Sequence, residues 1–117
     1  MSLEEDSELN QIKSELISRM LESIEEGETS YSEENVEECR DVLNAHLRCL
    51  SQARNREQAL NCVMNTVEQL NELNEEADHH LLQSRSGELI CEFMALAGAK
   101  RGFNTEDEDI TENWRDW

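Results

Sequence analysis

The sequence predicts an all-α protein, a bundle of four main helices plus a short C-terminal helix, in a single domain over residues 1–117. Three observations predict this fold. Proline is absent and only 4 of 117 residues are glycine, so little interrupts a helix. Four segments repeat apolar residues at helical spacing. The stretch SGELICEFMALAGAKRGF, residues 86–103, is apolar or small on nearly all sides, which is typical of a central helix.

The first helix is expected over Glu4 to Glu26, with Gly27 ending it. Its apolar stripe covers about half of the circumference. The stripe consists of Leu9, Ile12, Leu16, Ile17, Met20, Leu21 and Ile24. A stripe this wide needs two neighbouring helices or a second chain. We therefore expect the first helix to flank a core made by the other three and to offer Ile17 and Leu21 to a second copy.

The second and third helices are expected to form an antiparallel hairpin. Ser32 or Ser30 caps the second helix, and Ser30 lies three residues before a glutamate, the spacing of a capping box. The third helix is expected over residues 57–75. Asn55 and Gln58 have the same capping spacing just before it, so the connecting turn is short and the two helices lie side by side.

In the remaining chain, single polar residues and glycines indicate where helices begin and end. Asn74 falls on the apolar stripe of the third helix, where its amide either fixes register or partner choice or caps the helix end. Residues 78–85 are expected as a loop that packs back on the body or as a turn of helix. Ser86 is expected to cap the central helix, and Gly102 to end it in the left-handed conformation.

The C-terminal segment carries both tryptophans of the chain. Ile110, Trp114 and Trp117 are spaced i, i+4 and i+7, which predicts one face of a short helix. Left in water, the two indole rings would form a large apolar patch in a very polar chain. We therefore expect this segment to dock on the body.

The chain is strongly acidic, with a formal net charge of −18. Residues 1–41 carry 14 acidic and 3 basic side chains, and residues 103–117 carry 6 and 1. Such a surface repels nucleic acid and anionic membranes and attracts a basic protein. The predicted partner-binding residues are Glu33, Glu34, Glu37 and Glu38, together with Ile17 and Leu21. The competing interpretation is a charged surface that serves solubility alone.

The four cysteines, Cys39, Cys49, Cys62 and Cys91, are expected to be reduced thiols in the core, because no two have C-x-x-C spacing. A disulfide or metal framework is the alternative. His46 and Cys49 are spaced like metal ligands on a helix, but zinc needs further ligands from other segments. Glu76-x-x-His79 is half of a di-iron motif without a second half.

The sequence contains no phosphate-binding glycine loop and no nucleophile elbow. We therefore predict no catalytic residue, no cofactor, no metal and no enzyme activity. No stretch reaches the roughly 20 apolar residues of a membrane span, and the acidic start is unlike a signal peptide. A cytoplasmic protein without membrane partners is the simplest expectation.

Three blocks resemble, in this order, an uncharacterised family of small, acidic, all-helical bacterial proteins that end in a WRDW-like tail. The blocks are LNELNEE (Leu70–Glu76), LICEFMALAGAKRGF (Leu89–Phe103) and EDITENWRDW (Glu108–Trp117). They cover about the last half of the chain, while the first half matches only in helical pattern. The resemblance implies an all-helical fold and a bacterial, cytoplasmic origin. Families of this kind have unknown function, although some are suspected to be immunity or accessory proteins. The resemblance therefore assigns no site residue to this chain.

The leading functional prediction is a non-enzymatic protein-interaction protein, in one form an immunity-type antagonist of a basic partner. One alternative is a homodimeric accessory protein that associates through the first helix. Another is a small metal-binding protein or enzyme built around His46 and the cysteines. Metal analysis of the purified protein distinguishes the interaction protein from the metal-binding protein or enzyme. A toxin gene next to the gene of this protein would favour the antagonist over the homodimeric accessory protein.

Overall fold

The computed structural model describes residues 2–27, 29 and 31–117. This part of the chain folds into one short 3₁₀-helix and four α-helices, without a β-strand. The elements are η1 (Leu3–Glu5), α1 (Ser7–Glu25), α2 (Glu33–Gln52), α3 (Arg56–Glu76) and α4 (Ser84–Lys100). The predicted all-α bundle of four main helices is confirmed.

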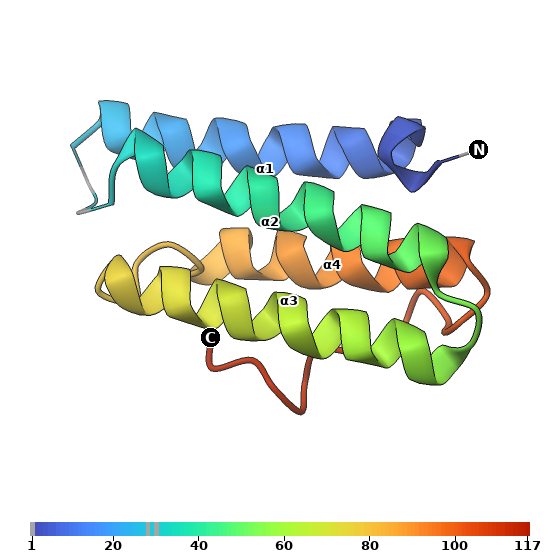
Figure 1. Cartoon of the computed structure of the whole chain (residues 1–117). Coiled ribbons are helices and arrows are strands. Elements are labelled where there is room, and N and C mark those ends of the chain that lie inside the picture. The colour runs from blue at the N-terminus through green and yellow to red at the C-terminus, as the bar shows by residue number, and fades with distance from the viewer. Residues whose placement is uncertain (1, 28, 30) are drawn as a thin grey trace.

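Successive helices run in opposite directions, so each of the four α-helices is one pass along the bundle (Figure 1). The closest packing is between α2 and α3 and between α1 and α4, and α1 also contacts α2. By contrast, α3 and α4 make few direct backbone contacts along their length. The C-terminal segment, residues 104–117, bridges these two helices instead.

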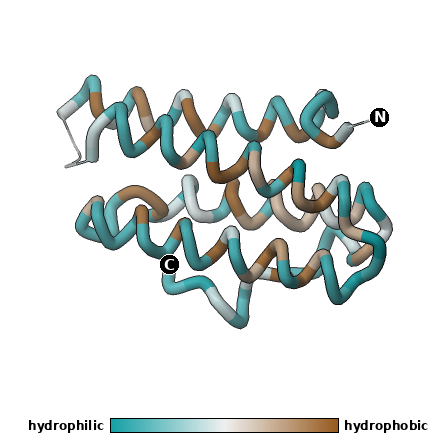
Figure 2. The backbone as a smooth tube through the Cα atoms, in the orientation of Figure 1, coloured by the Kyte–Doolittle hydropathy of each residue, from teal (hydrophilic) through white to brown (hydrophobic). Residues whose placement is uncertain are grey.

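All four helices contribute to one hydrophobic cluster. The hydrophobic positions of each helix are concentrated on the sides that face the other helices (Figure 2). The fully buried side chains include Leu9, Leu16 and Met20 of α1, Leu43, Leu47 and Leu50 of α2, Val67 and Leu70 of α3, and Ile90, Phe93 and Met94 of α4. The expectation that α1 only flanks a core of three helices is therefore wrong, because two intrachain neighbours bury most of its stripe.

The helix α4 is one of four equivalent members rather than a central helix. Glu88 and Glu92 on its outer side are exposed to solvent. The sequence suggests a helix surrounded on all sides because small residues occupy much of its surface. Gly87 and Gly98 are in fact buried where the C-terminal segment crosses the helix, and this segment takes the place of a further helix.

The predicted hairpin of α2 and α3 is present with its caps. Ser32 caps α2: its hydroxyl accepts a hydrogen bond from the backbone N–H of Asn35, whose side chain accepts one from the N–H of Ser32 in return. Asn55 caps α3 by accepting a hydrogen bond from the N–H of Gln58 at 2.9 Å. The alternative cap, Ser30, lies outside the described residues.

The start of α4 differs from the expectation, whereas its end agrees. The helix begins at Ser84, so Ser86 lies in its first turn and caps nothing, and no side chain caps this end. Gly102 has a φ of 77°, which a residue without Cβ adopts at no steric cost. The N–H of Phe103 then reaches the carbonyl of Gly98 at 3.0 Å, the longer of the two bonds that define a Schellman motif.

The predicted short C-terminal helix is not formed: residues 110–114 are turns. Asp109 explains this outcome. Its carboxylate accepts hydrogen bonds from both the N–H and the hydroxyl of Thr111, at 3.0 and 2.6 Å. Such local side-chain bonds offer the backbone an alternative to helical bonds. The spacing of Ile110, Trp114 and Trp117 is that of a helix face, but with the hydrogen bonds from Thr111 to Asp109 the backbone adopts turns instead.

The segment nevertheless docks on the body, as the sequence predicts. Ile110 is buried, and both tryptophans pack against the hydrophobic cluster. Asn71 of α3 donates a hydrogen bond to the carbonyl of Trp114 at 2.9 Å and accepts one from the N–H of Asp116 at 3.2 Å. Trp117 reaches over to α4, where a Cβ on Gly87 would meet its indole at 2.7 Å.

Candidate functional site

The predicted acidic contact residues lie on the first turns of α2. Glu33, Glu34 and Glu37 are exposed, and Glu38 is half-buried beside α3. Glu37 forms an exposed ion pair with Arg40 at 3.2 Å, which contributes little to stability in water. The helix dipole favours these carboxylates at an N-terminus, so their presence there has a structural explanation.

The two apolar contact residues predicted on α1 have different environments. Ile17 is 6% exposed and belongs to the hydrophobic core. Leu21 is 39% exposed and is the large hydrophobic residue that stands out on the described surface. Of this pair, Leu21 alone presents apolar surface to a second molecule.

A groove between α2 and α3, with a volume of about 310 Å³, collects acidic side chains from both helices. We call it the acidic groove. Its lining residues are Glu38, Asp41 and Val42 of α2 and Gln69, Glu72, Leu73 and Glu76 of α3. Leu73 is buried and Val42 half-buried, so the groove has an apolar floor between two rows of carboxylates.

Helical spacing brings these residues together. Positions 38, 41 and 42 share one face of α2, and positions 69, 72, 73 and 76 share one face of α3. Because the two helices pack side by side in opposite directions, both faces open onto the same groove. Glu38 was among the predicted contact residues, whereas Asp41, Glu72 and Glu76 were not.

The four carboxylates of the acidic groove form no ion pair with any residue that the structure describes. Six of the ten basic side chains of the chain are engaged elsewhere. Ion pairs with other carboxylates occupy Arg40, Arg48, Arg56, Arg85, Lys100 and Arg115. The groove is therefore a site of uncompensated negative charge, where like charges repel and a cation would be attracted.

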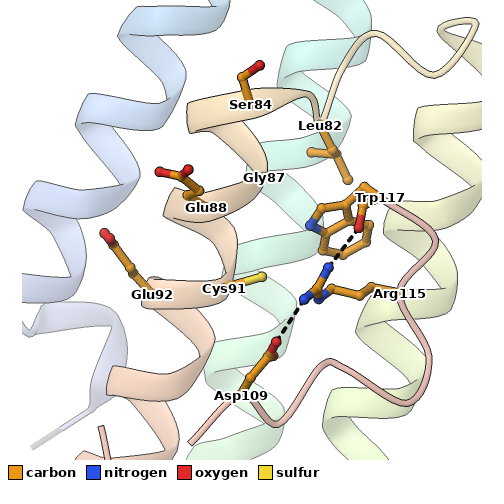
Figure 3. A pocket seen from close by; sticks show the side chains of 9 residues that line it. All are labelled: Leu82, Ser84, Gly87, Glu88, Cys91, Glu92, Asp109, Arg115 and Trp117. Atoms are coloured by element: carbon orange, nitrogen blue, oxygen red, sulfur yellow. Dashed lines mark hydrogen bonds and ion pairs between the residues drawn. The ribbon is translucent and has the colours of Figure 1, made fainter. Parts of the chain in front are cut away.

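A second hollow, of about 460 Å³, lies where the C-terminal segment crosses α4 (Figure 3). We call it the tail cavity. Its lining comprises Leu82 from the α3–α4 connection, Ser84, Gly87, Glu88, Cys91 and Glu92 of α4, and Asp109, Arg115 and Trp117 of the segment. Arg115 points into it and bonds the carboxylate of Asp109 at 2.9 Å and the backbone carbonyl of Trp117 at 2.7 Å.

The polar groups of the tail cavity mainly hold the segment in place. Burial raises the pKa of Asp109, but hydrogen bonds from Thr111 and Arg115 outweigh this effect and hold the pKa below its usual value. The thiol of Cys91 lies 3.5 Å from the hydroxyl of Thr111. No histidine is among the residues that line the cavity beside Cys91. The indole N–H of Trp117 has no partner among the described residues.

The predicted reduced state is wrong for two of the four cysteines. Cys49 of α2 and Cys62 of α3 form a disulfide, with their Cα atoms 6.0 Å apart. Cys39 and Cys91 are free, and burial raises the pKa of the Cys39 thiol to about 12. The sequence held a signal for the pairing, since these two cysteines flank the short turn at Asn55 at nearly equal distance.

His46 is 1% exposed and faces α3, where its Nδ1 lies 2.8 Å from the hydroxyl of Thr66. Burial lowers its pKa to about 4, and Nε2 has no partner among the described residues. In this part of the chain, no three His, Cys, Asp or Glu side chains converge as metal ligands. The disulfide also removes Cys49 as a thiolate partner of His46.

None of the helices described by the structure has the length and apolar character needed to cross a bilayer. Comparisons with protein families, curated proteins and solved structures each return no match to this chain. The resemblance to a family of small acidic bacterial proteins therefore stays a prediction.

Proposed function

We propose that this chain is a non-enzymatic protein-interaction protein that binds a basic partner through the acidic groove and the adjoining glutamates of α2. The observation that carries the proposal is the set of four unpaired carboxylates above an apolar floor. A surface that serves solubility alone needs scattered charges. It does not need two rows of one sign on facing helices around a buried leucine and a half-buried valine.

The net negative charge of the chain supports a positively charged partner. A net charge of −18 steers a basic protein towards the chain and raises the association rate, most strongly at low salt. Glu33 and Glu34 extend the acidic surface along α2 beyond the groove, towards the start of the helix. Basic residues bound there would also relieve the repulsion among the groove carboxylates, so binding should stabilise the fold.

The shape of the groove supports the partner's form. An amphipathic helix places one apolar row between two polar rows, at the same i, i+3 and i+4 spacing that builds the groove. Its apolar row would contact Val42 and Leu73, and flanking lysines or arginines would reach the carboxylates. The occupant we propose is therefore a basic amphipathic helix of another protein.

Titration with a helical peptide of lysine and leucine tests this proposal. We expect NMR shift changes to concentrate on α2 and α3 around the groove. The variant Glu72→Lys/Glu76→Lys should weaken binding by roughly tenfold or more, since it removes two attractive charges and adds two repulsive ones. The control Glu22→Lys/Glu25→Lys makes the same change of net charge on exposed positions of α1 and should weaken binding far less at physiological salt. Equal effects of the two variants would mean that only net charge matters and would refute the groove.

An immunity-type antagonist is the form of this function in which the basic partner is a toxin whose activity the chain blocks. A stoichiometric complex that silences the partner, and that the Glu72→Lys/Glu76→Lys variant no longer forms, would support it. A cytoplasmic location also stays a proposal. The disulfide weighs against it, because disulfides are typical of oxidising compartments.

The homodimeric accessory protein is the second candidate, and Leu21 favours it. A single exposed leucine is normal on a protein surface, so this observation carries less weight than the groove. Sedimentation of the wild type and of Leu21→Glu would test it, since a dimer through α1 should dissociate in the variant. Ile17 is unsuitable for this test because it is buried in the core, where a charge would destabilise the monomer itself.

A further inference from the structure

The disulfide between α2 and α3 is exposed on one side and buried on the other. Cys49 is exposed to solvent, whereas Cys62 is 5% exposed. Next to Cys62, one helical turn further along, Thr66 meets the buried His46, so Cys62 lies on the side of α3 that faces the core. An attacking group from solution therefore meets the sulfur of Cys49 first.

A shallow cavity of about 270 Å³ lies over the disulfide. We call it the amide cavity. Besides both cysteines, it is lined by Gln52, Ala53, Gln58, Asn61 and Asn65. No charged side chain is among these residues, although nearly a third of the chain is charged. The amide cavity thus contrasts with the acidic groove on the same two helices.

The side-chain amides of the cavity are available to a ligand. Gln58 accepts a hydrogen bond from the backbone N–H of Arg54 at 2.8 Å. The side chains of Gln52, Asn61 and Asn65 form no hydrogen bond with the described residues. Neutral donors and acceptors of this kind match the amide groups of a short peptide.

Absence of local negative charge matters because the nucleophile in thiol–disulfide exchange is a thiolate. Carboxylates beside the disulfide would repel it and lower its local concentration. In this acidic chain the opening above the one disulfide of the described residues has no carboxylate in its lining, which favours that approach. The volume of this opening, about 270 Å³, and its amide lining suit a small peptide thiol, which we take as the reactant.

We propose that Cys49 is a site of reversible thiol–disulfide exchange with low-molecular-weight thiols of the peptide type. The thiolate attacks Sγ of Cys49, a new S–S bond forms there, and the bond to Cys62 breaks. The electron pair leaves with Sγ of Cys62, which takes a proton from water. The products are a mixed disulfide on Cys49 and a free thiol on Cys62, and attack by the Cys62 thiolate on Cys49 reverses the step.

This reaction makes the α2–α3 crosslink responsive to the thiols around the protein. The site lies at the closed end of the hairpin, near the turn at Asn55, whereas the acidic groove extends towards the other end. Exchange at Cys49 is therefore independent of the proposed partner binding, and either proposal can fail while the other holds.

Trapping the mixed disulfide tests the proposal on the native protein. The folded, oxidised chain is treated with reduced glutathione, quenched with N-ethylmaleimide and mapped by peptide mass spectrometry. We expect glutathione on Cys49 and maleimide on Cys62 while circular dichroism still reports a folded chain. Glutathione on Cys62, equal labelling of both sulfurs, or exchange only after unfolding by guanidinium would each overturn it.

Single-cysteine variants give a second, independent measurement. In Cys62→Ser the remaining Cys49 should react with oxidised glutathione at least several-fold faster than Cys62 does in Cys49→Ser, and both variants lack the same crosslink. Asn61→Asp/Asn65→Asp keeps the disulfide but adds two carboxylates to the amide cavity, so it should slow exchange with glutathione, and high salt should restore part of the rate. Equal reactivity of the two cysteines, or a rate unaffected by the two aspartates, would show that access and local charge do not direct the reaction.

Discussion

The side chain of Asn74 holds the connection between α3 and α4: its oxygen accepts a hydrogen bond from the backbone N–H of Leu82 at 3.0 Å. Asn74 is 2% exposed and Leu82 1%, so neither group can exchange this partner for water. The connection also contains Asp78 and His79 with positive φ values of 55° and 63°, which non-glycine residues adopt at a cost. From the sequence, Asn74 was expected to fix the register of the helix or to cap its end. In the structure its side chain instead holds the loop between α3 and α4.

Replacing Asn74 by alanine should destabilise the fold by about 1–3 kcal/mol, because the N–H of Leu82 is left buried without an acceptor. Urea unfolding monitored by circular dichroism measures the change. Asn61→Ala is the matched control: it removes the same amide from an exposed position of the same helix and should change stability by less than about 0.5 kcal/mol. Equal effects would mean that the Leu82 bond contributes nothing.

Removing residues 110–117 should lower the melting temperature, because the segment fills the space between α3 and α4. Burial of the two partly buried indoles and Ile110 contributes on the order of 3 kcal/mol. At about 4 °C per kcal/mol for a domain of this size, the expected drop is roughly 10 °C. Differential scanning calorimetry measures it, and an unchanged transition would show that the segment is free in solution.

Gly87→Ala tests the same docking without shortening the chain. The new Cβ would meet the carbonyl of Leu82 at 2.6 Å and the indole of Trp117 at 2.7 Å, so the indole has to move away. Tryptophan fluorescence should shift towards longer wavelength as the ring becomes hydrated. Ser86→Ala, one position earlier on the same helix, is the control and should leave the spectrum unchanged.

The helices were predictable from sequence because each carries a strong local signal. Apolar spacing of 3.6 residues, Asn55 as a cap and Gly102 as a left-handed end all depend on residues a few positions apart. The relation of α1 to its neighbours was not predictable, since a wide apolar stripe is equally satisfied by two helices of the same chain or by a second chain. Ile17 was therefore placed at an interface, although the bundle buries it.

The acidic groove likewise combines residues that the local sequence indicates with residues that only the packing of two helices brings together. Glu38 was singled out from its own helix, but Glu72 and Glu76 join it only through the register between α2 and α3. That register follows from the short turn at Asn55, and it also places Cys49 opposite Cys62. Which sulfur is exposed depends on the rotation of each helix about its axis, which local sequence does not specify.

Loss of the crosslink should destabilise the fold without changing it. Closing a loop of 13 residues restricts the unfolded chain, and the chain-entropy estimate for such a loop is about 3 kcal/mol. Cys49→Ser/Cys62→Ser should therefore unfold at lower urea concentration with a native circular dichroism spectrum. Cys39→Ser/Cys91→Ser alters two free thiols and should keep the response to reductant, which the first variant should lose. A double variant at Cys49 and Cys62 as stable as the wild type would exclude a stabilising disulfide.

Acidification should weaken the fold through His46. Its pKa is lowered from 6.5 to about 4 by burial, so the unfolded chain binds the proton between these pH values and the folded chain does not. Stability from this group is complete above pH 6.5 and is lost as the pH falls towards 4, by roughly 3 kcal/mol in total. Urea unfolding across this range, compared with His46→Asn, isolates the effect, because asparagine keeps a polar atom near Thr66 but does not titrate. Protonation of the many carboxylates affects both proteins alike, and parallel pH profiles would show that His46 is not the group responsible.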